Sequence, residues 1–147
     1  MLNLITDRSQ YHVNLLLSYR KRNWEKMSPT EQATWYNEAA KGAYNYTDLN
    51  RVEAAVGVVS GIFGLNLTTK TDWTLWDVPT QSDMERYLGN VAKIRARIQS
   101  VPNLPTLPSS MNNLNYRYAN NIELVLLRAY EFAESVVQSG EIYSGEV

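Results

Sequence analysis

The chain has 147 residues, a length that suits one domain of ordinary size, and it contains no cysteine. Hydrophobic residues make up 44% and charged residues 20% of the chain, values typical of globular proteins rather than disordered ones. The 14 basic and 15 acidic side chains leave a formal net charge of −1, without the basic excess of nucleic-acid-binding proteins. The absence of cysteine excludes disulfides, thiolate metal sites and cysteine nucleophiles.

The sequence shows no targeting or membrane segment. Its first residues lack the charged and apolar regions of a signal peptide. The most apolar stretch, residues 56–67, is short and interrupted by glycines, so it is not expected to span a bilayer. These features predict a soluble protein.

Two helices are predicted in the first third of the chain. The first spans residues 8–27, with Asp7 as its N-cap and apolar side chains at helical spacing. The second begins at Ser28, where serine, proline and glutamate follow in the order of a capping box, and it ends at Gly42. The basic cluster at residues 20–22 is expected to be a solvated surface near a helix C-terminus.

The third predicted helix opens at Thr47-Asp48 and carries a broad apolar face as far as residue 63. Gly57, Gly61 and Gly64 share one face of this helix. Because mid-helix glycines lower helix propensity, their presence predicts the close approach of another helix there.

The middle of the chain is irregular before it becomes helical again. Residues 66–79 have no periodicity and contain Trp73 and Trp76. A fourth helix is predicted to begin with a cap at Thr80 and to end before a proline-rich linker at residues 101–110.

The last predicted helix is the longest, running from Asn112 to Ser139 and closing at Gly140. Such a helix spans roughly 40 Å, so it either forms the spine of the fold or protrudes and pairs with a second copy. Together the elements predict an all-α fold. We expect residues 1–147 to form a single helical domain, a compact bundle of about five helices with a long C-terminal helix and an irregular Trp-containing loop.

The sequence carries no catalytic signature. The single histidine, His12, lacks the clustered partners of a metal site and is expected at the surface or partly packed. No nucleophile elbow or glycine-rich phosphate loop is present. Glu123, Glu131 and Glu134 are expected along a solvated edge of the last helix. The prediction is therefore a protein that is not an enzyme and has no cofactor or metal.

Aromatic residues are the one compositional excess, with four Trp, ten Tyr and two Phe. Trp73 and Trp76 lie in the irregular loop, and Tyr44 and Tyr46 lie in the turn before the third helix. Exposed aromatic side chains stack on sugar rings and form hot spots in protein interfaces. These four residues are the candidate binding residues; the alternative is that they fold inward and cover the core.

Several short sequence strings lie in this order along nearly the whole chain: ITDR at residues 5–8, KGAYNYTDLNRV at 41–52, TDW at 71–73, DMERYL at 83–88, LPSSM at 107–111, ANNIE at 119–123 and YSGE at 143–146. Together they resemble a family of small helical proteins encoded in phages and prophages of Gram-positive gut bacteria. Members of that family are tail-associated or minor structural proteins. The chain departs from the usual pattern at residues 58–61, where a more polar, tyrosine-containing helix is typical.

The resemblance implies a virion structural or adaptor protein that is made in the bacterial cytoplasm and located in the virion. Its implied partners are other virion proteins and a second copy of itself, with neither nucleic acid nor membrane. The alternative is a carbohydrate- or cell-wall-binding module, in which Trp73, Trp76 and Tyr46 stack on a glycan of the host surface.

Overall fold

The computed structural model describes residues 2–139 and is entirely helical over that range, with no strand. It contains five α-helices and three short 3₁₀ turns: α1 (Gln10–Tyr19), η1 (Trp24–Lys26), α2 (Pro29–Asn37), η2 (Ala39–Gly42), α3 (Tyr46–Phe63), α4 (Gln81–Arg97), η3 (Met111–Asn113) and α5 (Tyr116–Ser139). The predicted all-α fold with a long C-terminal helix is confirmed. None of these helices is both long and apolar enough to cross a membrane.

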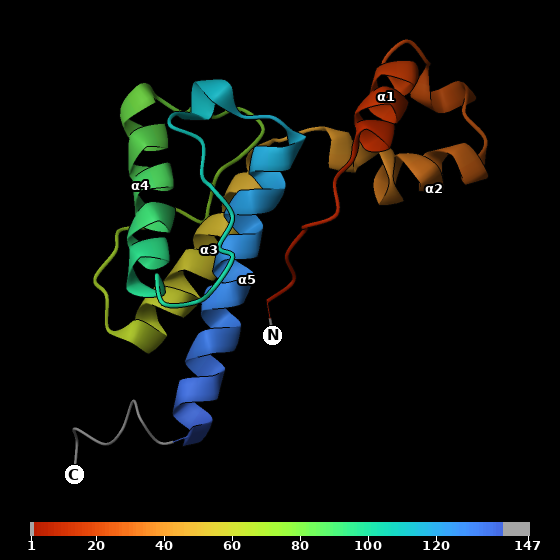
Figure 1. Cartoon of the computed structure of the whole chain (residues 1–147). Helices are drawn as coiled ribbons and strands as arrows, with labels where there is room; N and C mark the ends of the chain where they lie inside the picture. The colour runs from red at the N-terminus through yellow and green to blue at the C-terminus, as the bar shows by residue number, and fades with distance from the viewer. Residues whose placement is uncertain (1, 140–147) are drawn as a thin grey trace.

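Helices α3, α4 and α5 pack against one another in a three-helix bundle (Figure 1). Helix α5 contacts both of the others, and its Ile122, Val125, Leu126 and Ala129 have no exposed surface. The last helix therefore forms the spine of the bundle, and its pairing with a second copy stays a prediction. Its C-terminal end extends past α3 and α4 (Figure 1).

Helices α1 and α2 form a small unit beside the bundle, which we call the arm, residues 10–43 (Figure 1). The turn η2 packs against both arm helices, and Tyr19, Met27 and Ala39 form a buried cluster separate from the bundle core. The described residues thus contain two hydrophobic clusters. That the whole chain behaves as one domain stays a prediction.

An extended N-terminal segment, residues 2–9, connects the arm to the bundle, and we call it the strap. The Ile5 amide donates to Glu123 Oε1 of α5 at 3.0 Å. The side chain of Asn120 accepts from the Arg8 amide at 3.0 Å and donates to the Arg8 carbonyl at 2.9 Å. These bonds fix the strap along α5 through its backbone.

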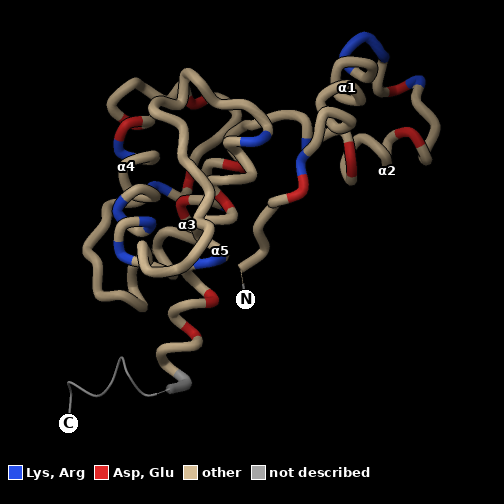
Figure 2. The backbone as a smooth tube through the Cα atoms, in the orientation of Figure 1, with Lys and Arg blue, Asp and Glu red and all other residues tan. Residues whose placement is uncertain are grey.

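The first helix is shorter than predicted. Helix α1 begins at Gln10, after Ser9, because the Ser9 amide donates to His12 Nδ1 at 2.9 Å in a capping box. The predicted cap, Asp7, instead pairs with Lys41 at 3.0 Å. The helix ends at Tyr19, and the basic cluster that follows it lies exposed in the loop after α1 (Figure 2).

The other helix starts follow the predictions more closely. Ser28 and Thr80 cap α2 and α4 as predicted, each in a capping box. Helix α3 is capped by Asn45, slightly earlier than predicted. Helix α5 begins at Tyr116 rather than Asn112, because residues 111–113 form η3. The predicted stop at Gly140 lies outside the described residues.

The predicted close approach of a helix to the α3 glycines is wrong. A Cβ atom added at Gly57, Gly61 or Gly64 would meet nothing within 4 Å. Gly64 has φ of 69° and is the left-handed C-cap of α3, a conformation that favours glycine. Gly57 and Gly61 face open space, so packing within this chain does not account for them.

Gly42, in contrast, allows a close contact inside the arm. A Cβ atom here would clash with the backbone oxygen of His12. We expect Gly42→Ala to destabilise the arm by about 1–3 kcal/mol, the usual cost of overpacking. Native-state hydrogen exchange should show faster exchange in α1 and α2 and unchanged protection in α5. An equal loss of protection in α5 would contradict a separate arm.

Candidate functional site

Three of the four candidate aromatic residues meet at one hollow of the bundle. Tyr44, Tyr46 and Trp73 line a cavity of about 480 Å³ whose other walls include Met84 of α4 and Met111 of η3. The fourth residue, Trp76, does not line it. The structure therefore separates the two loop tryptophans, although only two residues lie between them.

Trp73 belongs to the core and is only 5% exposed. Its Nε1 donates to Glu53 Oε2 at 2.7 Å. The side chain of Asn50 donates to the Trp73 carbonyl at 2.9 Å and accepts from its amide at 2.8 Å. The hypothesis that Trp73 is an exposed stacking residue is wrong, because its ring and its polar atoms are engaged with α3.

The same contacts anchor the irregular loop on both sides. Glu53 is 1% exposed, and Arg86 of α4 donates to its two oxygens at 2.5 and 3.0 Å. Arg86 and Asn90 also donate to the carbonyl of Thr68, at 2.9 and 2.7 Å. The loop lacks regular secondary structure but is held by side chains of α3 and α4.

The loop projects a closed turn that we call the tip turn, Thr74–Val78. The amide and hydroxyl of Thr74 donate to Asp77 Oδ2 at 2.7 and 3.1 Å. The Asp77 amide donates back to the Thr74 carbonyl at 3.1 Å, and the Trp76 amide donates to Thr74 Oγ1 at 3.3 Å. Such local side-chain bonds fix a turn without help from the core.

The tip turn exposes three large apolar side chains. Leu75 is 69%, Trp76 87% and Val78 86% exposed. Large apolar side chains that lie exposed beside one another on a surface are typical of a binding site. The candidate site that survives in the structure is therefore the tip turn, with Trp76 as its centre.

Tyr44 and Tyr46 are half-buried, and Tyr44 has a structural role. Its hydroxyl shares a hydrogen bond with the hydroxyl of Tyr87, which is 1% exposed. The Arg8 guanidinium lies 5.4 Å from the centre of the Tyr44 ring. Burial raises the pKa of both Tyr44 and Tyr87 above the ordinary value.

Because of this tyrosine pair, the free energy of unfolding should decrease at alkaline pH. The folded protein keeps both phenol protons above pH about 10, where the unfolded chain loses them, so stability is complete below that pH and falls above it. Urea unfolding on either side of pH 10 should show this fall. The double variant Tyr44→Phe/Tyr87→Phe should show a smaller one. An identical fall in that variant would contradict the assignment.

A buried ionic network joins strap, α3 and α5, and the sequence did not reveal it. Glu123 has no exposed surface, and its oxygens accept from Arg8 at 2.7 Å and from Arg51 at 2.7 and 2.9 Å. Asp48 accepts from the same two arginines at 3.0 and 2.5 Å. The expectation of a solvated edge is wrong for Glu123, because these arginines neutralise it in the interior. It holds for the exposed Glu131 and Glu134.

The positive charges of the two arginines balance the negative charges of the two carboxylates in this network. Burial lowers the pKa of Arg51, but the hydrogen bonds and charges of Glu123 and Asp48 outweigh that effect and raise it. Each oxygen of the two carboxylates accepts at least one hydrogen bond, so the network holds the strap against α3 and α5.

His12 is also more buried than predicted. It is 7% exposed, and its Nε2 lies 3.0 Å from Glu38 Oε2. Among residues 2–139, no three His, Asp or Glu side chains lie together as a metal site would require.

Comparison with known protein families, with curated proteins and with solved structures finds no match for the chain.

Proposed function

We propose that this protein is a non-enzymatic structural or adaptor module of a phage or prophage virion, associated with the tail. It acts through protein–protein contacts made by the tip turn. The observation that carries the proposal is the exposure of Leu75, Trp76 and Val78 on a turn closed by Thr74 and Asp77. The phage context rests on the family resemblance of the sequence strings.

The chemistry of the tip turn favours an apolar protein surface as partner. Tryptophan is among the commonest hot-spot residues, and a preformed turn loses little conformational entropy on binding. A sugar-binding site also needs polar side chains beside the ring, and one carboxylate oxygen of Asp77, Oδ2, is already engaged by Thr74. In a symmetric particle, repeated copies would turn weak single contacts into strong attachment.

The proposal is tested by mass spectrometry of particles purified after prophage induction. Parent protein should be present at stoichiometric copy number, and Trp76→Ala protein should be depleted from the particles while remaining folded in the lysate. Tyr36→Ala is the matched control, because Tyr36 is 70% exposed but lies on the arm. Finding the parent protein only in the lysate would overturn the virion assignment.

The exposed indole of Trp76 also supports the second candidate, a glycan- or cell-wall-binding module. Tryptophan fluorescence during titration with host cell-wall fragments separates the two. A spectral change that Trp76→Ala abolishes would favour glycan binding. No change, together with depletion of that variant from particles, would favour the protein contact.

A further inference from the structure

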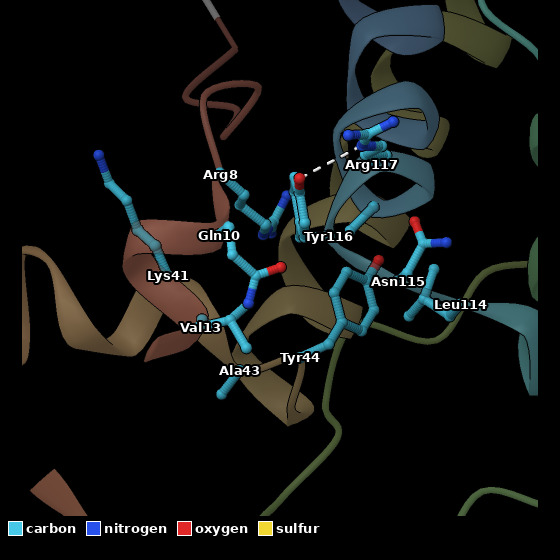
Figure 3. A pocket seen from close by; sticks show the side chains of 12 residues that line it. Arg8, Gln10, Val13, Lys41, Ala43, Tyr44, Leu114, Asn115, Tyr116 and Arg117 are labelled. Carbon is cyan, nitrogen blue, oxygen red and sulfur yellow. Dashed lines mark hydrogen bonds between the residues drawn. The ribbon is translucent and has the colours of Figure 1, made fainter. Parts of the chain in front are cut away.

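A cleft of about 640 Å³ lies between the arm and the start of α5 (Figure 3), and Tyr44 lines both this cleft and the hollow described above. The arm contributes Gln10, Val13 and Lys41 to its walls, and the bundle contributes residues 114–117. Its volume lies in the range of small-molecule sites, which often form where two units meet.

The charged side chains that line this cleft are all cationic: Arg8, Lys41 and Arg117. Arg8 and Lys41 have carboxylate partners elsewhere. Arg117 has none among the described residues; its Nε donates to the hydroxyl of the neighbouring Tyr116 at 3.2 Å. The other guanidinium N–H groups of this exposed side chain remain available to a ligand.

The first turn of α5 adds backbone donors to the same cleft. Asn115 caps the helix, with its side chain accepting from the Tyr118 amide at 2.9 Å and its carbonyl from the Ala119 amide at 2.8 Å. The amides of Tyr116 and Arg117 lie before the first amide that bonds within the helix, so they have no acceptor inside it. Unpaired amides and the helix dipole together attract anions at a helix start.

An independent observation comes from Arg8. It is 4% exposed, and its Nε is the one buried side-chain nitrogen or oxygen in the described residues that lacks a hydrogen-bond partner. Figure 3 shows the Arg8 side chain among the residues that line the cleft. Arg8 also lines the cleft, so a buried donor without an acceptor lies in its wall.

We propose that the cleft binds an organic oxyanion, a phosphate or carboxylate group carried on an apolar or ring-shaped body. The oxyanion lies at the start of α5, where Arg117 and the first amides donate to it. The body lies against Val13, Tyr44 and Leu114, which form the apolar part of the wall. Such a ligand contacts arm and bundle at once, and its binding does not depend on the tip turn or on a virion location.

The test is an NMR titration of the full chain with phenyl phosphate, benzoate and inorganic phosphate at constant ionic strength. We expect the Tyr116 and Arg117 amide signals to shift with both aromatic anions, and inorganic phosphate to bind more weakly. Arg117→Gln should weaken binding about tenfold or more, the loss of a charge-assisted hydrogen bond. The relative affinities of phenyl phosphate and benzoate show which oxyanion the cleft prefers.

The control is Arg128→Gln, which removes a cation from the same helix outside the cleft and should leave binding unchanged. Circular dichroism verifies that both variants stay helical. The proposal is overturned if the two amide signals do not move at tens of millimolar anion, or if both variants weaken binding equally. Inorganic phosphate binding as tightly as phenyl phosphate would remove the apolar half of the proposal.

Discussion

Replacing Glu123 with glutamine should lower the free energy of unfolding by about 3–5 kcal/mol, the usual cost of breaking a buried ion pair from one side. Glu123 has no exposed surface and accepts hydrogen bonds from the strap amide of Ile5 and from two arginines. Without the negative charge of Glu123, Asp48 is the only carboxylate left in the network to pair with Arg8 and Arg51. For a domain of ordinary stability this is a large part of the total. Urea unfolding followed by circular dichroism measures the loss.

Glu131→Gln is the matched control, because Glu131 lies exposed on the same helix and should change stability by no more than about 0.5 kcal/mol. In a double-mutant cycle, Arg51→Met should cost less in the Glu123→Gln background than alone, since the two side chains interact directly. A loss for Glu123→Gln of about 1 kcal/mol or less, as for an exposed salt bridge, would show that the network contributes little.

The network also shows how far sequence reasoning extends for charged residues. Glu123 lies four residues after Ala119 and three before Leu126, so helical spacing places it on the buried face of α5. That signal was present in the sequence. Its partner Arg8 is 115 residues away, and no local pattern indicates that an extended strap will bring a guanidinium to this point.

Helix starts were predictable where the capping chemistry is local. The boxes at Ser28 and Thr80 need only residues within one turn, so the sequence alone identifies them. The start of α1 differs from the prediction because it depends on residues far along the chain. Asn120 bonds the Arg8 amide and carbonyl, and Lys41 pairs with Asp7.

The candidate binding residues illustrate the same limit. Trp73 and Trp76 lie in a loop without periodicity, so nothing in the sequence shows which one faces inward. Trp73 faces inward because Asn50 and Glu53, one turn apart on α3, bind its backbone and its indole. The Trp76 indole has no such partner among the described residues, and the Trp76 amide bonds only to Thr74 of the same turn.

The two tryptophans should therefore respond to substitution in opposite ways. Trp73→Ala should lower the free energy of unfolding by about 3–5 kcal/mol, because it leaves a cavity in the core. Trp73→Phe keeps most of the packing but leaves a Glu53 oxygen without its indole donor, a loss of about 1–3 kcal/mol. Trp76→Ala should stay within about 0.5 kcal/mol of the parent, as exposed positions do.

Urea unfolding of the three variants measures these changes in stability. Mass spectrometry of purified particles measures the attachment of Trp76→Ala and Trp73→Phe. Trp76→Ala keeps its stability and loses attachment, whereas Trp73→Phe loses stability and keeps attachment as long as it stays folded. Because the tip turn is closed by its own hydrogen bonds, damage at Trp73 should reach it only through unfolding of the loop. Equal loss of attachment in folded Trp73→Phe protein would show that the presentation of Trp76 depends on the core beneath it.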